Sequence, residues 1–162
     1  NHRADEYGSS VENRCRFGLE VAKAALEVAG PERTALRISP SREMGGVLYE
    51  WPQLEEMLAY MIPQLDKLGL RILDISCARS DTVDIYHLTS GKIVRMIRSM
   101  WPHIIIAGAS LPPEEAEKEI ADGLVDLVTY GRFILATPDF VKKITSGEPL
   151  VPYDPEMRKT LY

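Results

Sequence analysis

The chain has 162 residues, with 19 lysines and arginines against 24 aspartates and glutamates, which gives a formal net charge of −5. This length favours one domain, and a composition of 45% hydrophobic and 27% charged residues excludes disordered, collagen-like and disulfide-stabilised chains. A pI near 5.3 without a long basic run excludes nucleic acid and anionic lipid as main partners.

Targeting signals and cysteine usage indicate the compartment. The apolar runs are too short to span a membrane, and no signal peptide is recognisable, so we expect a soluble, cytoplasmic protein. Cys15 and Cys77 show no metal-ligand spacing and are expected to be free thiols. The chain starts at Asn1 rather than at methionine, so either the start was removed or the chain is a piece of a longer one.

Helical and strand-like segments alternate along the chain. Apolar residues between Val11 and Ala29 recur with a helical period, with Ser10 placed to cap the helix and Gly30 to end it. The predicted elements are helix 11–29, strand 34–39, a loop containing Gly45 and Gly46, helix 52–68, strand 71–76, helix 89–100, strand 104–108, helix 112–122, strand 124–131, helix 138–145 and an irregular tail 147–162.

This alternation predicts an α/β fold of consecutive βα units around a parallel sheet. Strands as apolar as these also predict that both faces of the sheet are covered. A closed (β/α)₈ barrel takes about 250 residues, so four units would make half of one. A doubly wound open sheet is the alternative, although its G-x-G-x-x-G fingerprint is absent.

Two of the predicted strands end in glycine, at Gly108 and Gly131, and Arg132 follows the second. Backbone amides at such positions can approach an anion closely, and an arginine supplies a forked donor that suits phosphate. The loops after the last two strands of a barrel often bind phosphate. The other interpretation is that both glycines only turn the chain and that Arg132 is solvated.

Arg37 lies in the middle of the short strand 34–39, where an unpaired charge is costly to bury. It is therefore expected to face either a polar ligand or a carboxylate at the carboxyl end of the sheet. Asp74, at the matching place in the next strand, is the natural salt-bridge partner. The residues alone leave the ligand and the salt bridge equally supported.

Other polar and aromatic residues give weaker signals. His87 and His103 have no second ligand at metal spacing and are expected to be solvated or locally bonded. Cys77 has no indicated base and is expected to be a small buried thiol. Tyr130 could stack on a ligand or pack in the core.

A family resemblance rests on the opening segment 1–17, NHRADEYGSSVENRCRF. It resembles the N-x-R-x-D-E-Y-G-G-S-x-E-N-R-x-R-F motif of the Old Yellow Enzyme family. Further matching segments follow in the family's order: LRISP at 36–40, AG at 107–108, YGRF at 130–133 and PDFV at 138–141. The resemblance implies an FMN-dependent, NAD(P)H-oxidising ene-reductase built on a (β/α)₈ TIM barrel, with residues 1–162 as the C-terminal half of that single domain, strands five to eight only.

The resemblance also implies roles for individual residues. Arg37 matches the arginine that lies against the flavin ring near N1 and O2, where a cation stabilises the negative charge of reduced flavin. Gly108 and Ala109 match the phosphate loop after strand seven. Gly131 and Arg132 match the loop after strand eight that holds the FMN phosphate.

The chain departs from the family pattern in several places. Ser9 stands where the family usually has glycine, Ala4 where threonine is common, and Thr129 where glycine is frequent. The family's substrate-binding His/Asn or His/His pair and its proton-donating tyrosine precede the opening motif, so no catalytic residue is assigned in this chain. No metal site is expected either.

These observations support one leading function and two alternatives. The resemblance implies an intact enzyme that moves a hydride from NAD(P)H through FMN to the β-carbon of a small activated alkene. It also implies that the missing N-terminal half is the partner of this chain and that this chain is inactive alone. One alternative is a non-catalytic truncated product that binds phosphate or FMN weakly or not at all. A phosphate-binding aldolase or isomerase is disfavoured, because no strand ends in a lysine or in paired carboxylates.

The same half-barrel interpretation predicts how the isolated chain behaves. The outermost strands 34–39 and 124–131 would have unpaired backbone edges, and the inner face of the sheet would lack a cover. We therefore expect the isolated chain to be dimeric, aggregated or loosely folded.

Overall fold

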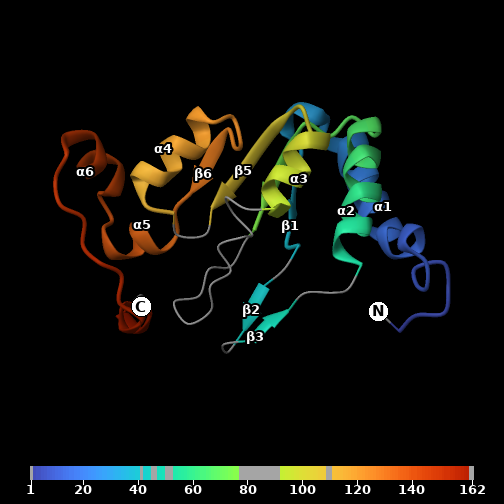
Figure 1. The fold of residues 1–162 in the computed structure, drawn as a ribbon, viewed down its shortest axis with the longest axis horizontal. Coiled ribbons are helices and arrows are strands. Elements are labelled where there is room, and N and C mark those ends of the chain that lie inside the picture. Colours follow the sequence, from blue (N-terminus) through green and yellow to red (C-terminus); the bar gives the residue numbers. More distant parts are fainter. Residues whose placement is uncertain are drawn as a thin grey trace.

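The computed structural model describes residues 2–40, 42–44, 47–49, 53–76, 92–108 and 111–160. Its helices are α1 (Val11–Ala29), α2 (Leu54–Lys67), α3 (Lys92–Met100), α4 (Pro113–Ala121), α5 (Arg132–Ala136) and α6 (Phe140–Ser146), with 3₁₀ turns η1 (Pro31–Arg33) and η3 (Pro155–Thr160). The strands are β1 (Ala35–Ile38), β2 (Arg42–Met44), β3 (Val47–Tyr49), β4 (Ile72–Ile75), β5 (Ile104–Gly108) and β6 (Leu127–Thr129) (Figure 1).

The main sheet has four strands in the order β1-β4-β5-β6, and all three pairings are parallel. Neighbours in space therefore follow one another in the chain, with helices in the connections. A doubly wound sheet reverses its strand order after the first strand, whereas a barrel does not. The predicted parallel βα architecture is confirmed, and the strand order is that of consecutive barrel strands.

The hydrophobic core lies on one face of this sheet only. Leu73, Ile75 and Ile105 point from the strands into a cluster with the apolar sides of α2 and α3, and α1 packs against α2. Successive strand residues point to opposite faces, and on the other face Ile104 and Leu127 are 40% and 54% exposed. The prediction that both faces are covered is therefore wrong for the described residues.

Helix α1 begins and ends where the sequence predicts. The Ser10 side chain accepts a hydrogen bond from the Asn13 backbone N–H at 3.3 Å, and Gly30 ends the helix with a φ of 78°. The residue before the cap, Ser9, has a φ of 67°. This left-handed conformation favours glycine, which is the residue that the resembling family usually has there.

Several predicted boundaries differ from the structure. The segment expected as a loop around Gly45 and Gly46 carries the antiparallel strands β2 and β3 on either side of these two glycines, which lie outside the described residues. The last strand starts only at Leu127, because Gly123 (φ 70°) ends the preceding helical turn and the Asp126 side chain accepts from the Ile105 N–H. Helix α5 and the turn η3 were not predicted.

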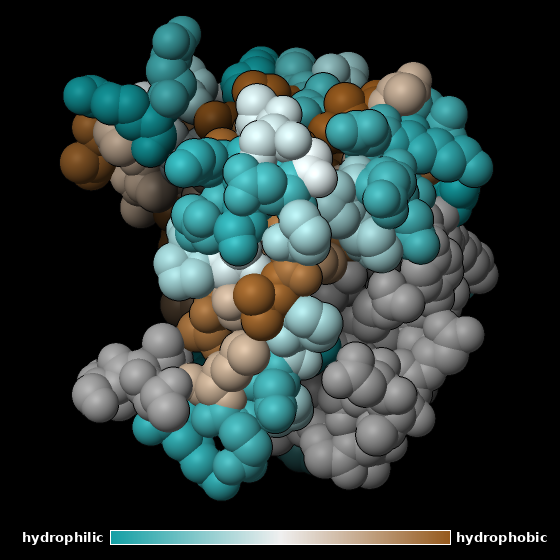
Figure 2. Space-filling view, turned by 90° about the vertical axis from the view of Figure 1, so that its left-hand side faces the viewer, coloured by the Kyte–Doolittle hydropathy of each residue, from teal (hydrophilic) through white to brown (hydrophobic). Residues whose placement is uncertain are grey.

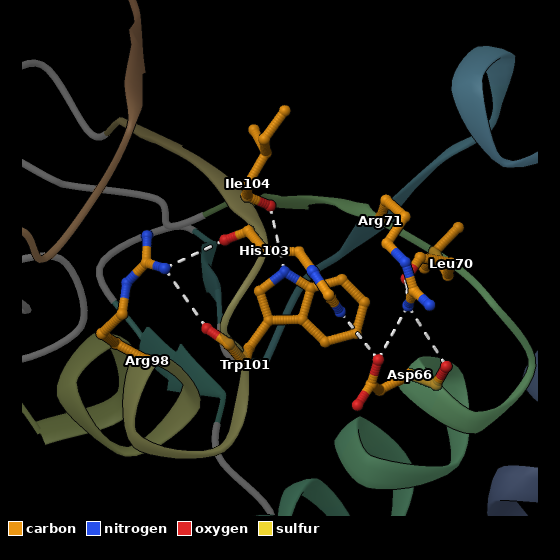
Figure 3. A network of polar contacts seen from close by, with 7 residues as sticks. All are labelled: Asp66, Leu70, Arg71, Arg98, Trp101, His103 and Ile104. Carbon is orange, nitrogen blue, oxygen red and sulfur yellow. Dashed lines mark hydrogen bonds and ion pairs between the residues drawn. The ribbon is translucent and has the colours of Figure 1, made fainter.

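Arg98 on α3 fixes the loops at the amino ends of β5 and β6, and Figure 3 shows its contacts with the first of these loops, at Trp101 and His103. Its guanidinium donates to the carbonyl oxygens of Leu124, Trp101 and His103 at 2.9 to 3.2 Å and to the Asp126 carboxylate at 2.5 Å. One partly buried cation thus binds three loop carbonyls and one carboxylate.

A second group of contacts joins α2 to the same end of the sheet. The Asp66 carboxylate lies 2.8 Å from His103 Nε2 and accepts from the Arg71 guanidinium at 2.7 Å (Figure 3). The hydrogen bond with His103, reinforced by the charge of Arg71, lowers the pKa of Asp66. His103 is therefore locally bonded, as expected. No helix in the described part of the chain is long and apolar enough to cross a membrane.

Candidate functional site

The opening motif forms a compact loop against α1. Arg3 pairs with the Asp5 carboxylate, which also accepts from the Tyr7 backbone N–H at 3.1 Å. The Tyr7 hydroxyl donates to Glu20 at 3.0 Å. Gly8 lies so close to the Arg3 carbonyl that an added Cβ would overlap it. The motif residues therefore hold one another and anchor the loop to the helix.

Arg37 lies at the carboxyl end of β1, in register with Asp74 of β4. Its Nε atom is 3.6 Å from Asp74 Oδ2, and its Nη2 donates to Ser76 Oγ at 3.4 Å. The side chain of Arg37 stays 63% exposed, whereas that of Asp74 is 18% exposed. The second carboxylate oxygen, Asp74 Oδ1, is buried and has no hydrogen-bond partner among the described residues.

The predicted salt bridge and an exposed guanidinium therefore occur together at Arg37. Both side chains lie on the open face of the sheet, because Arg37 and Asp74 occupy the same alternating positions as Ile106 and Leu127. The exposed guanidinium of Arg37 offers several N–H donors to a ligand on this face, whereas the buried Oδ1 atom of Asp74 is not accessible to one. This arrangement suits a ligand that carries acceptor atoms.

Gly108 ends β5 directly beside Thr129 of β6. A Cβ added at Gly108 would lie 2.6 Å from the Thr129 carbonyl oxygen and closer still to its Oγ1. Glycine is therefore required here for close contact between the two strands. Ala109, the next predicted phosphate-loop residue, lies outside the described residues.

Gly131 and Arg132 follow β6 at the start of α5. Gly131 has a φ of −95° that any residue adopts, and no atom lies within 4 Å of the place of an added Cβ in the described structure. The open space at Gly131 leaves its backbone accessible to a ligand. The Arg132 guanidinium lies 5.6 Å from the centre of the Tyr153 ring, from the segment before η3.

Tyr130 is a packing residue rather than a free stacking platform. Its ring lies 4.7 Å from that of Phe140 and 5.7 Å from that of Phe133, between centroids. Burial raises the pKa of its hydroxyl, and the charge of Glu117 adds to this effect. The aromatic cluster fixes α5 and α6 against the end of β6.

The remaining polar candidates do not add a reactive group or a metal ligand to the described part of the site. Cys15 is a free, buried thiol whose pKa is raised by burial. Cys77 and His87 lie outside the described residues. Among the residues that the structure describes, no group of three histidine, cysteine or acidic side chains could hold a metal ion.

A separate hollow of about 310 Å³ lies between α1 and α2. It is lined by side chains of both signs, including Glu12, Arg16, Glu20 and Lys23. These side chains come from the helices that pack on the core side of the sheet, whereas Arg37 lies on its open face. The hollow therefore contributes nothing to the candidate site.

Sequence reasoning missed three contacts of this site. Ser76 binds Arg37, Thr129 blocks any side chain at Gly108, and Tyr153 lies against Arg132. Ser76 could have been found from the strand register, because it lies two residues after Asp74. Tyr153 belongs to the predicted irregular tail, where no periodicity indicates a contact.

The fold is a four-stranded parallel βα sheet with the strand order of a barrel, and the candidate site with Arg37 lies at the carboxyl edge of this sheet. The model of the NADH:flavin oxidoreductase / NADH oxidase family matches residues 1–150. The chain therefore belongs to this family, and the resemblance to the Old Yellow Enzyme family is confirmed.

Individual relatives agree with this assignment. The chain is 36% identical over 155 residues to a probable flavin mononucleotide-dependent alkene reductase of Leishmania infantum, covering 96% of this chain and 40% of the relative. It is 34% identical to 12-oxophytodienoate reductase 2 of Arabidopsis thaliana, covering 100% and 42%. A solved structure of morphinone reductase in complex with tetrahydroNAD superposes with a TM-score of 0.76 at 32% identity, covering 97% and 40%. The chain spans about two fifths of the length of these relatives.

Proposed function

We propose that this chain is the flavin-binding part of an FMN-dependent NAD(P)H oxidoreductase that reduces activated alkenes, the α,β-unsaturated carbonyl compounds. The printed names of its relatives support the substrate class, since they include an alkene reductase and 12-oxophytodienoate reductases. The complex of morphinone reductase with tetrahydroNAD supports a nicotinamide co-substrate.

The observation that carries the proposal is the exposed guanidinium of Arg37 beside Asp74 on the open face of the sheet. FMN, when bound, would supply the hydride-transfer chemistry between NAD(P)H and the alkene. Arg37 would help to hold the cofactor through its exposed guanidinium, whose fixed positive charge would stabilise negative charge beside it. Asp74 and Ser76 hold the guanidinium in place through their contacts with it.

The phosphate of the cofactor is assigned to the other half of the site. The backbone at Gly108, Ala109 and Gly131 would donate to phosphate oxygens, and Arg132 would add a forked cationic donor. Gly131 has the open space that such an approach needs. None of these residues is a proton donor to substrate, so we expect the 162-residue chain alone to show no alkene-dependent oxidation of NAD(P)H above background.

Titration with FMN, followed by ultraviolet-visible absorbance, tests the proposal. It is performed on the chain alone and after addition of the N-terminal half of a relative. Arg37→Ala should weaken FMN binding by about 2 to 4 kcal/mol, and Arg37→Lys should restore part of it, because lysine lacks the planar fork.

Arg33→Ala is the matched control, since Arg33 precedes the same strand and donates to the Ala29 carbonyl. This variant should bind FMN like the unmodified chain. A flavin spectrum that stays unchanged in both formats would refute the cofactor assignment. If the Arg37→Ala variant bound FMN as tightly as the unmodified chain, Arg37 would have only a structural role, in its salt bridge with Asp74.

A further inference from the structure

The C-terminal segment 147–160 folds back onto α5, the short helix that carries Arg132. Figure 1 shows this part of the chain, in red, running from α6 past α5 towards the C-terminus, and the turn η3 contacts α5. Figure 2 faces this end of the molecule and shows mostly hydrophilic side chains around a smaller number of apolar ones. The segment therefore lies on the surface and depends on specific contacts to hold its place.

Hydrogen bonds fix the backbone of this segment on either side of Tyr153. The Val151 backbone N–H donates to the hydroxyl of Thr137 at 3.0 Å, and Thr137 is only 1% exposed at the end of α5. On the other side of Tyr153, the Asp154 carboxylate accepts from the Glu156 N–H at 2.9 Å and fixes the start of η3. Tyr153 lies between these two points, so its place beside α5 is well defined.

The ring of Tyr153 lies against the guanidinium of Arg132. The guanidinium carbon is 5.6 Å from the ring centre, which is within the range of a cation–π contact. Both side chains are half-buried. An arginine that is not supported in this way loses the freedom of several rotatable bonds when it binds an anion. A ring that already holds the guanidinium in one place makes this loss smaller.

We propose that Tyr153 is a positioning residue for the phosphate group of the cofactor. Its ring holds the Arg132 guanidinium beside the end of β6, where the forked N–H donors can pair with a phosphate monoester. Because the ring is neutral, it supports the guanidinium without competing with phosphate for its charge. This inference rests on the proposed function, which assigns the FMN phosphate to Arg132, and it adds the C-terminal segment to the cofactor site.

The place of Tyr153 predicts which part of the flavin depends on it. Arg132 follows β6, whereas Arg37, which is assigned to the ring system of the flavin, lies on β1 at the other end of the sheet order. Loss of the Tyr153 ring should therefore weaken the binding of FMN and spare that of riboflavin, which has the same ring system without the phosphate. A general disturbance of the fold would weaken the binding of both flavins.

Fluorescence titration with FMN and with riboflavin separates these two effects. It is performed on the chain alone and after addition of the N-terminal half of a relative. Tyr153→Leu should weaken the binding of FMN about threefold to tenfold and change that of riboflavin by less than about twofold. Tyr153→Phe should keep the FMN affinity, because the ring remains. Tyr60→Leu is the matched control, since Tyr60 is a half-buried tyrosine on α2, and it should bind both flavins like the unmodified chain.

A double-mutant cycle checks that the effect passes through Arg132. In the Arg132→Ala variant, the further change Tyr153→Leu should not weaken FMN binding again, because the guanidinium that the ring positions is gone. Far-UV circular dichroism checks that all variants keep their helices.

The outcomes separate this proposal from the cofactor assignment. An unchanged FMN affinity of Tyr153→Leu, an equal loss of FMN and riboflavin affinity, a loss in Tyr153→Phe as large as in Tyr153→Leu, or additive losses in the double variant would each overturn the role of Tyr153 and leave FMN as the cofactor. If the unmodified chain bound neither flavin in both formats, the proposed function would be refuted, and this inference with it.

Discussion

Replacing Arg98 by alanine should cost about 3 kcal/mol of unfolding free energy. The guanidinium makes four polar contacts, to the carbonyls of Leu124, Trp101 and His103 and to the Asp126 carboxylate. Each hydrogen bond contributes about 1 kcal/mol net, and a buried acceptor left without a donor costs about 1 to 3 kcal/mol. Water can reach part of this site, because the Arg98 side chain is 21% exposed. The total therefore falls below the sum of four full penalties.

Urea unfolding, followed by circular dichroism at one fixed protein concentration, measures this loss, since association would otherwise shift the midpoint. Arg95→Ala is the matched control, because Arg95 is an exposed arginine of the same helix. It should change stability by no more than about 0.5 kcal/mol. If both variants lost the same free energy, the contacts of Arg98 would not stabilise the fold in the way described.

Three further predictions address the loops and the strand ends. The pKa of Asp66 is lowered in the folded state, chiefly by its hydrogen bond with His103. The contribution of this carboxylate to the unfolding free energy is therefore present above about pH 4 and is lost as the pH falls through the folded pKa. In urea titrations between about pH 5 and pH 3, the Asp66→Asn variant should lose less stability than the unmodified chain. Gly108→Ala should cost about 2 kcal/mol of unfolding free energy in urea, and Thr129→Ala should not rescue it, because the backbone carbonyl still blocks the added methyl group. Ser9→Gly should raise the unfolding free energy by about 0.5 to 1 kcal/mol in thermal melts, because it removes a side chain from a left-handed backbone, and a lower melting temperature would contradict this reason.

Elements with a long apolar period were predictable from the sequence. Helix α1 has the predicted bounds, and β5 matches the predicted strand, because each combines a regular apolar pattern with a clear stop signal. Elements without such a pattern were not predictable. Helix α5 has only five residues and depends on aromatic packing between Tyr130, Phe133 and Phe140, which no local pattern records.

The candidate site was predictable where chemistry and register coincide. Arg37 and Asp74 are polar residues at matching positions of adjacent apolar strands, so their pairing follows from a parallel register. The contact of Arg132 with Tyr153 joins residues 21 positions apart through an irregular segment and could not be derived from spacing. The assignment of these residues to a flavin stays a prediction for the FMN titration.

The loop at residues 2–10 has a consequence for how such proteins are recognised. Its motif residues contact one another and α1: Arg3 pairs with Asp5, the Tyr7 hydroxyl donates to Glu20, and Gly8 lies against the Arg3 carbonyl. These contacts therefore maintain the shape of a turn. A chain without activity could keep the same residues for as long as it kept this turn, so the motif identifies the family and gives no information about turnover.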